Sequence, residues 1–277
     1  MYDNRHFGVY HKAARVGMVL LATGAALHGL NREAAATPAT LGFYPATDIY
    51  GKGSFHLDVD TYGVALKTDS VVSTGLTYGI GPERNGLLGR SEIGFDYLLS
   101  LGGSTPSTDT FKRLLFNAKT QLYNNDAAGT RIVGGVWGLG NKEIFAPNVG
   151  YLLGSKTFKW GRIHLGVAHS FADEEIIAVG ADADKTSLHL AYDRYITPKL
   201  QFAVDFYSGK NAYAGVQPTL YYYVNDKASF GLGLMHFNAE SVAPARNQIY
   251  LAFDYNFGGG STPAATPAAT LTPAPVP

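Results

Sequence analysis

The strongest constraint on the fold is a strict alternation of apolar and polar residues near the C-terminus, in residues 246–257. A helix would spread the apolar positions around its axis, whereas a β-strand has a period of two and places all of them on one face. The intervening residues are polar or small, and a stretch rich in Gly, Pro, Ala and Thr follows directly. The apolar side chains are Ile249, Leu251, Phe253, Tyr255 and Phe257. The pattern predicts a strand with one apolar and one polar face.

The overall composition narrows the class of protein. The chain has 277 residues and no cysteine, which excludes thiolate metal sites, disulfides and haem attachment through cysteine pairs. Its 22 basic and 22 acidic residues create no net field that would favour nucleic acid. Charged residues make up 16%, against about 25% in soluble domains. A mean hydropathy of −0.03 excludes a bundle of membrane helices, whereas the alternating strands of a membrane barrel average to such a value.

The same alternation recurs along most of the chain and predicts about twelve strands. Most are close to the roughly ten residues that a tilted membrane-spanning strand needs. They cover residues 54–60, 71–80, 90–100, 113–123, 130–140, 147–157, 160–170, 186–195, 199–207, 213–224, 229–237 and 246–257. The sequence therefore predicts an all-β fold, a transmembrane up-and-down antiparallel β-barrel of about twelve strands.

The connections between the predicted strands alternate in length. Tight turns rich in Pro, Asn, Asp and Lys occur at residues 156–159, 196–198 and 225–227. Longer loops separate other strands, as at residues 102–111 and 238–245. Short turns on one side and long loops on the other are typical of a barrel held in a membrane. An even number of strands would place both ends of the barrel on the short-turn side.

Periodicity does not say whether the apolar face points outward to lipid or inward to a core. Lipid offers no hydrogen bonds, so a membrane sheet must close and every strand must pair on both sides. The alternative is a soluble sandwich or a lipocalin-like barrel with its apolar residues inside. Tyrosines, Trp137 and Trp160 at positions suited to interfacial girdles, and glycines on the polar faces, favour lipid. Pro218 has no N–H for a central ladder, so we expect a bulge or a strand end there.

The N-terminus has the features of an export signal. Positive charges come first, then a short apolar run at residues 16–27, and then small residues that suit cleavage. We therefore interpret residues 1–39 as a signal peptide, with a retained amphipathic helix as the alternative. The positively charged residues are Arg5, Lys12 and Arg15.

The C-terminal tail differs sharply from the strands. Residues 258–277 are rich in Pro, Ala and Thr and cannot build a packed core. We predict that this tail is a disordered periplasmic extension. Residues 40–257 then form the barrel.

With these strands, the chain resembles the porin-like β-barrel proteins of the Gram-negative outer membrane. The resemblance covers residues 51–257 as architecture. It implies location in the bacterial outer membrane, contact with outer-membrane lipid, and recognition of the last strand by the barrel-assembly machinery. In this class an aromatic residue usually ends the chain, whereas twenty residues follow Phe257. The assembly signal would be the alternating set Ile249, Leu251, Phe253, Tyr255 and Phe257.

The polar faces of the strands predict the lining of a lumen. Acidic residues outnumber the basic residues Lys119 and Arg162 there, so an open lumen would attract cations. The first hypothesis is a channel, or porin, for passive diffusion of small solutes, with a weak cation preference and no cofactor. The alternative is a structural or adhesive barrel with a plugged lumen. The predicted pore-lining residues are His56, Asp58, Asp60, Glu92, Asp96, Asn117, Lys119, Gln121, Arg162, His164, His189, Asp193, Gln201, Asp205, Gln217, Tyr221, Asp254 and Asn256.

The usual motifs of hydrolases, nucleotide-binding proteins and zinc proteins are missing, so no enzyme activity, catalytic residue or metal is predicted. Ser187, His189 and Asp193 share one polar face, which leaves a barrel lipid hydrolase as a second alternative. Such a site would have to face lipid, and these side chains are expected to face water. The acidic loop at residues 171–185 lacks EF-hand spacing and is interpreted as a solvated surface loop.

Overall fold

The computed structural model describes residues 39–63, 70–82, 84–101, 113–140, 146–173, 177–178, 183–240 and 245–259. Residues 1–38 of the predicted export segment and residues 260–277 of the predicted tail lie outside this described part. Within the described residues, no helix is both long and apolar enough to cross a membrane.

Strands make up most of the described chain. The predicted strands agree with the observed ones to within three residues at each end, and only the two-residue strand β3 was not predicted. In chain order the strands are β1 (Ser54–Gly63), β2 (Val71–Ile80), β3 (Gly86–Leu87), β4 (Ser91–Leu101), β5 (Leu114–Asn125), β6 (Thr130–Leu139), β7 (Val149–Phe158), β8 (Gly161–Ser170), β9 (Thr186–Thr197), β10 (Leu200–Tyr207), β11 (Gly215–Tyr223), β12 (Ala228–Phe237) and β13 (Asn247–Gly258).

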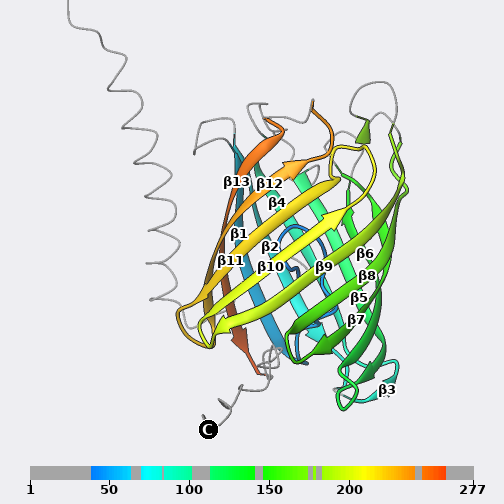
Figure 1. Cartoon of the computed structure of the whole chain (residues 1–277), viewed down its shortest axis with the longest axis vertical. Coiled ribbons are helices and arrows are strands. Elements are labelled where there is room, and N and C mark those ends of the chain that lie inside the picture. Colours follow the sequence, from blue (N-terminus) through cyan, green and yellow to red (C-terminus); the bar gives the residue numbers. More distant parts are fainter. Residues whose placement is uncertain are drawn as a thin grey trace, which may run out of the picture.

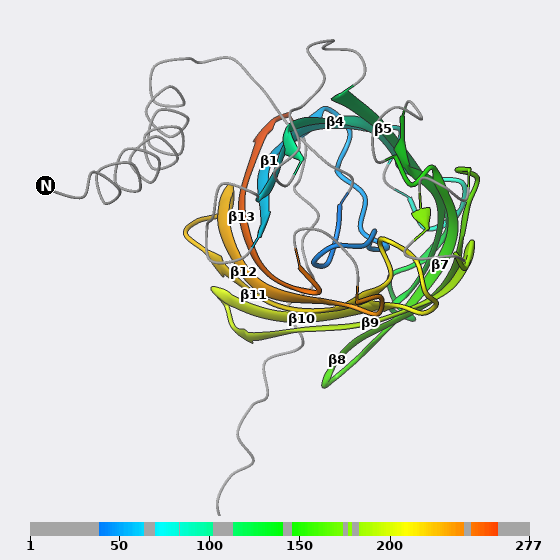
Figure 2. The ribbon, with the colours of Figure 1, turned by 90° about the horizontal axis from the view of Figure 1, so that it is seen from above.

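The twelve long strands form a closed up-and-down barrel (Figures 1 and 2). Each pairs antiparallel with the long strands before and after it, and β1 closes the ring by pairing with β13 from Ser54↔Gly258 to Gly63↔Ile249. The short β3 pairs with the end of β5. Closure gives every spanning strand two partners, which is what lipid demands of a sheet. The predicted all-β, twelve-stranded barrel is confirmed.

Short turns lie at the end of the barrel where β13 finishes, and we call this the turn end (Figure 1). They are residues 126–129, 159–160, 198–199 and 224–227. The opposite end, the loop end, carries connections such as residues 208–214. Residues 81–90 are the one longer connection at the turn end, and β3 folds that connection against β5.

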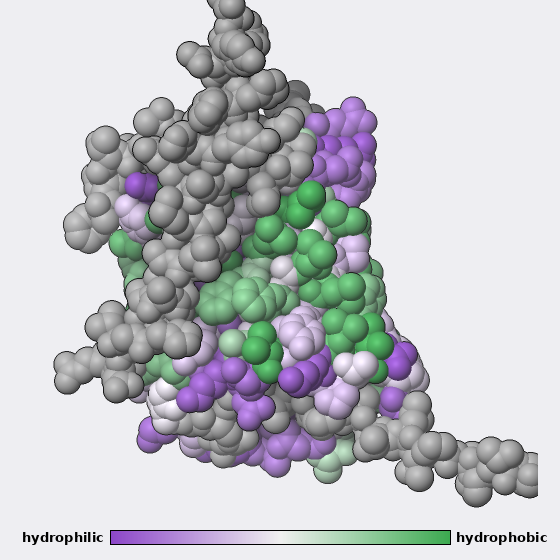
Figure 3. Space-filling view, turned by 90° about the vertical axis from the view of Figure 1, so that its left-hand side faces the viewer, coloured by the Kyte–Doolittle hydropathy of each residue, from purple (hydrophilic) through white to green (hydrophobic). Residues whose placement is uncertain are grey.

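The apolar faces of the strands point outward and the polar faces point inward. On β12, Leu234 is 61% exposed and its neighbour Met235 is 1% exposed. Buried polar side chains such as His164 and Gln217 lie on the opposite face from the exposed Leu165 and Leu220. On the face that Figure 3 shows, apolar residues gather at mid-height, with polar residues toward the two ends. The soluble alternative with an apolar interior is therefore wrong.

The prediction for Pro218 was wrong. Pro218 is the fourth residue of β11, and it pairs with Val204 of β10 without a register shift. On the other side, β11 pairs with β12 at Val216 and again from Thr219 onward, in the same register. The ladder therefore tolerates the missing N–H of proline as a local interruption, without the bulge or strand end that we expected.

Residues 39–50 are not part of the wall but lie inside the barrel, where Figure 2 shows them as a blue trace within the ring. We call them the luminal segment. The segment doubles back on itself, since Thr40 and Pro45 form an antiparallel bridge and the Ala46 N–H donates to the Ala39 carbonyl at 2.8 Å. Residues 51–53 then lead into β1. The sequence assigned no element to this stretch.

Candidate functional site

The tip of the luminal segment is held by one carboxylate of the wall. Asp205 of β10 accepts the backbone N–H groups of Gly42, Phe43 and Tyr44 at a single oxygen, Oδ2, with distances of 3.0, 3.1 and 3.1 Å. A Cβ at Gly42 would lie only 2.9 Å from Thr219 Oγ1, so glycine allows the backbone to approach the wall. Hydrogen bonds to an ionised acceptor are stronger than neutral ones. Asp205 is therefore the anchor of the tip.

A buried ion pair holds the two ends of the segment together. Glu92 of β4 accepts the Ala39 N–H at 3.0 Å through one oxygen and the Tyr50 N–H at 2.9 Å through the other. Lys119 of β5 lies 3.1 Å from Glu92 and donates to the carbonyls of Ala39 and Ala46 at 2.9 and 3.0 Å. Backbone groups therefore satisfy two charges that would be costly to bury alone.

A third anchor joins the segment to β6 and β8. Asp48 forms a two-point ion pair with Arg162, at 2.8 and 2.6 Å, and also accepts from Arg131 at 2.8 Å. Arg162 in turn donates to Asp193 at 2.9 Å, and His164 lies 3.0 Å from the same carboxylate. Burial alone would raise the pKa of Asp48, but the two guanidinium groups hold it well below its usual range. Asp48 is therefore a carboxylate in the folded protein.

Aromatic contacts close the lumen around the tip. Phe43 packs edge-on against Tyr62 of β1, Trp137 of β6 and Phe237 of β12, with ring centroids 5.2, 5.5 and 6.3 Å away. Tyr44 stacks on Tyr207 of β10 at 3.8 Å. These two side chains therefore contact strands on several sides of the ring at one level. The two side chains thereby bridge β1, β6, β10 and β12 across the lumen.

All the residues predicted to line a pore lie in the inner wall. Glu92, Lys119, Arg162 and Asp205 bind the luminal segment through hydrogen bonds or ion pairs. The rings of His56 and His189 contact Tyr50 and Tyr44 of the segment. Fifteen are buried and three are partly buried. The buried residues are His56, Asp58, Glu92, Asp96, Asn117, Lys119, Gln121, Arg162, His164, His189, Asp193, Gln201, Asp205, Gln217 and Tyr221, and the partly buried ones are Asp60, Asp254 and Asn256. Their role as the lining of a conducting pore stays a prediction.

Other predicted residues bind one another along the wall. Asn117 donates to Asp96 at 2.8 Å, and His56 lies 2.8 Å from the Asn256 side-chain oxygen. Asp58 stands opposite Asp254 in the β1–β13 ladder. Outward on β13, the predicted assembly signal is half-buried on the membrane face, and its recognition by assembly machinery stays a prediction. That set is Ile249, Leu251, Phe253, Tyr255 and Phe257.

Sequence reasoning missed Asp48, Arg131 and the two tip aromatics Phe43 and Tyr44. Residues 41–50 have no strand period, but they contain three aromatic residues, which is more than a solvated linker needs. That excess was the available signal. Arg131 was missed because it begins a glycine-rich strand whose two faces are hard to assign.

The arrangement gives little support to hydrolysis. Ser187, His189 and Asp193 are buried on the inner face, and within the described residues neither ring nitrogen of His189 has a hydrogen-bond partner. The described part of the chain contains no group of three or more His, Asp or Glu residues suited to a metal ion. In the acidic loop, Asp184 accepts the Lys210 N–H at 2.7 Å. Glu174, Glu175 and Asp182 of that loop lie outside the described residues.

A closed antiparallel barrel with an apolar outer face, a polar inner face and short turns at one end defines a transmembrane β-barrel of the bacterial outer-membrane class. No protein-family model and no curated protein matches the chain. Several solved structures are similar to it at low identity. None of these similarities distinguishes channel from enzyme.

One is the KdgM porin in complex with disordered oligogalacturonate, at 10% identity over 74% of this chain and 99% of that chain, with a TM-score of 0.46. A second is an outer-membrane channel from Pseudomonas putida F1, at 13% identity over 80% and 99%, with a TM-score of 0.45. A third is the outer-membrane phospholipase A from Escherichia coli, at 12% identity over 76% and 94%, with a TM-score of 0.40.

Proposed function

We propose that the protein is an outer-membrane channel for small solutes that its own luminal segment holds closed in this conformation. The observation that carries the proposal is that the barrel wall does not need the luminal segment for its strand pairing. The twelve long strands close on one another without any strand from residues 39–50. Among the described residues, the segment is bound through side chains and local backbone contacts, so it can leave without breaking the barrel ladder.

If the luminal segment left the lumen, the inner wall exposed there would carry more acidic than basic side chains. Without the segment, the carboxylates of Glu92 and Asp205 lose their backbone partners and face the lumen. Lys119, Arg131 and Arg162 are the opposing cations. Charged rings of this kind select ions by their field, so a weak preference for cations is part of the proposal. The other acids of the wall are Asp58, Asp60, Asp96, Asp193 and Asp254.

A reversible crosslink between segment and wall tests the proposal. Thr47 Oγ1 of the segment lies 2.7 Å from Ser155 Oγ of β7, and the chain has no cysteine of its own. The double variant Thr47→Cys/Ser155→Cys should form a disulfide under oxidising conditions. In planar bilayers we expect no conductance from the oxidised protein and full conductance after reduction. The two single variants, treated identically, should conduct in both states.

Equal conductance before and after reduction, with the disulfide confirmed by mass spectrometry, would show that solutes do not pass by displacing the segment. The second candidate function is a permanently plugged structural barrel. The burial of the Glu92–Lys119 pair favours it, because both side chains are about 1% exposed or less. Silence of the native chain and of the reduced variant at every applied voltage would assign that role.

A further inference from the structure

The membrane face of β9 contains a cation, Arg194, that forms no ion pair with the part of the chain that the structure describes. Along this strand the side chains of Leu188, Leu190 and Tyr192 point outward, and Arg194 is the next residue on that face. Ile196, 53% exposed, follows it. A charge on the lipid face costs least near the membrane interface, and the position of Arg194 near the turn end fits that level.

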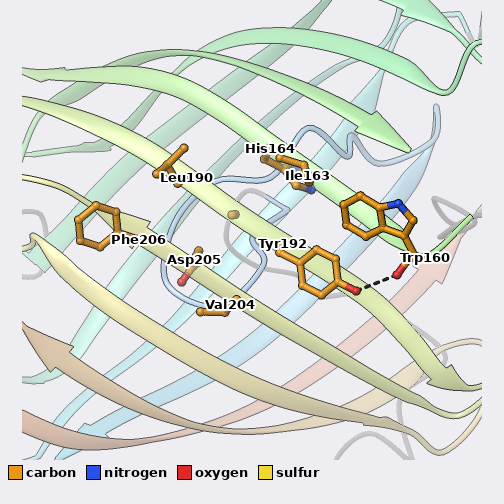
Figure 4. Close-up of a pocket in the computed structure, with 9 residues that line it drawn as sticks. Trp160, Ile163, His164, Leu190, Tyr192, Val204, Asp205 and Phe206 are labelled. Carbon is orange, nitrogen blue, oxygen red and sulfur yellow. Dashed lines mark hydrogen bonds between the residues drawn. The ribbon is translucent and has the colours of Figure 1, made fainter. Parts of the chain in front are cut away.

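An apolar groove of about 320 Å³ lies on the same face, directly next to Arg194 on the side of the loop end. Ile163, Tyr192 and Val204 form one row of paired residues across β8, β9 and β10, and Arg194 pairs with Phe202 in the next row toward the turns. Figure 4 shows the residues that line the groove, with Trp160 at its turn-end side. The labelled residues are Trp160, Ile163, His164, Leu190, Tyr192, Val204, Asp205 and Phe206.

Glycine shapes the turn-end wall of the groove. Gly161 has a φ of +148°, and a Cβ there would lie 2.5 Å from the ring of Tyr192. Without a side chain at this position, Tyr192 lies across the strand and its hydroxyl donates to the Trp160 carbonyl at 2.8 Å. Trp160 also stacks on Phe158 at 5.0 Å. Amphipathic aromatic rings of this kind are characteristic of the headgroup level of a bilayer.

Two further cations flank the groove. Lys156 is exposed on the outer face of β7, where it pairs with Ile163, and its ammonium donates to the Ala128 carbonyl. Lys159 is exposed in the turn that precedes Trp160. Asp126, an acid of this rim that lines a neighbouring pocket with Arg194, lies 3.8 Å from Arg131. The exposed charge around the groove is therefore predominantly positive.

We infer that the groove and its cations form a binding site for an anionic glycerophospholipid of the leaflet that faces the turn end. One acyl chain lies against Ile163, Val204 and Phe206, and the phosphate group binds Arg194 and Lys159. The groove supplies apolar contact, and the cations supply a charge that a zwitterionic headgroup would not match as well. The site is independent of the lumen and of whether the barrel conducts.

Native mass spectrometry of the detergent-purified barrel tests this inference. The probes are dioleoyl phosphatidylglycerol, which is anionic, and dioleoyl phosphatidylcholine, which is zwitterionic. We expect the native chain to bind phosphatidylglycerol more tightly. Arg194→Gln and Lys159→Gln should each weaken that binding about fivefold, because a surface cation contributes about this factor toward anionic lipid. Binding of phosphatidylcholine should stay unchanged.

Two further variants separate the contribution of the cations to lipid binding from that of the shape of the groove. Lys227→Gln removes an exposed cation from the turn between β11 and β12 on the same rim, outside the groove that β8, β9 and β10 form, and should leave both affinities unchanged. Val204→Trp should fill the groove and weaken both lipids alike. The inference is wrong if the native chain binds the two lipids equally, if Lys227→Gln acts like Arg194→Gln, or if lipid A displaces phosphatidylglycerol from the native chain.

Discussion

Asp205 shows how one side chain can control the whole luminal segment. Its single oxygen Oδ2 accepts three consecutive N–H groups, from Gly42 to Tyr44, and the close approach of Gly42 leaves no room for a side chain. Sequence patterning placed Asp205 on the inner face of β10 correctly. Its partners could not be predicted, because they are backbone groups about 160 residues away and backbone donors leave no signature in a sequence.

Neutralising Asp205 should loosen the tip. Asp205→Asn replaces the carboxyl oxygen that accepts three hydrogen bonds by a neutral amide, which is a weaker acceptor than a carboxylate. We expect the open probability in planar bilayers to rise at least tenfold. The matched control is Asp254→Asn, since Asp254 accepts from Ser229 and, among the described residues, forms no hydrogen bond with the segment. Both variants should lower cation selectivity, but an equal rise in open probability would contradict the anchoring role of Asp205.

The lowered pKa of Asp48 sets a pH window for its anchor. A depressed pKa means that the ion pair stabilises the folded segment fully above the ordinary aspartate value of about 4, and that this contribution is lost as pH falls through the lower folded value. The groups facing Asp48 are Arg162, Arg131 and His164. In conductance titrations, the difference between the native chain and Asp48→Asn should be constant from pH 8 to about 5 and shrink below about 4. A difference that disappears already near neutral pH would refute this assignment.

The strands could be predicted from the periodicity of their sequence, whereas the luminal segment could not. The prediction for β2 was correct at both ends because its alternation is regular, and β7 was placed two residues early because glycines blur its faces. The bulge predicted at Pro218 is absent, because a ladder already supported by β10 can bear one missing donor on the side of β12. The segment has no period at all, since its contacts are local backbone hydrogen bonds and side chains at scattered positions of the wall.

Deleting residues 40–50 should leave a folded barrel. Every long strand keeps both neighbours, so we expect unchanged β-structure by circular dichroism and a retained shift between heated and unheated samples on gels. The melting temperature should fall, because Tyr44 loses its stacking on Tyr207 and buried charges lose their partners. The deletion variant should conduct continuously. A chain that no longer folds would show that the segment is a required core.

At the scale of the whole molecule, all features of the barrel fit one arrangement, with the apolar faces of the strands toward lipid and the polar faces inside. Closure through β1 and β13, the apolar band and the inward charges all agree with one placement, with the short turns at one membrane surface. Alternation predicted the barrel but could not decide which face lies inside. The structure decides it through the burial of polar groups such as Gln217 and Glu92.

Neighbouring residues on β12 test this orientation directly. The chain lacks cysteine, so Leu234→Cys and Met235→Cys can each carry one fluorescent label. In vesicles, nitroxide-bearing lipids should quench a label at residue 234 strongly and a label at residue 235 weakly, because the first side chain is 61% exposed and the second 1%. Equal quenching, with both labelled proteins folded, would contradict the assigned faces.

The hydrogen bonds of Glu92 to both Ala39 and Tyr50 affect how the proposed channel opens with time. Because one carboxylate binds both ends of the luminal segment, the segment cannot dissociate from one end alone. Breaking either hydrogen bond to Glu92 disturbs the other bond and the contacts of the Lys119 ammonium as well. The current through a single molecule should then jump between two levels. A current that rises in several small steps would mean that the two ends of the segment dissociate one after the other.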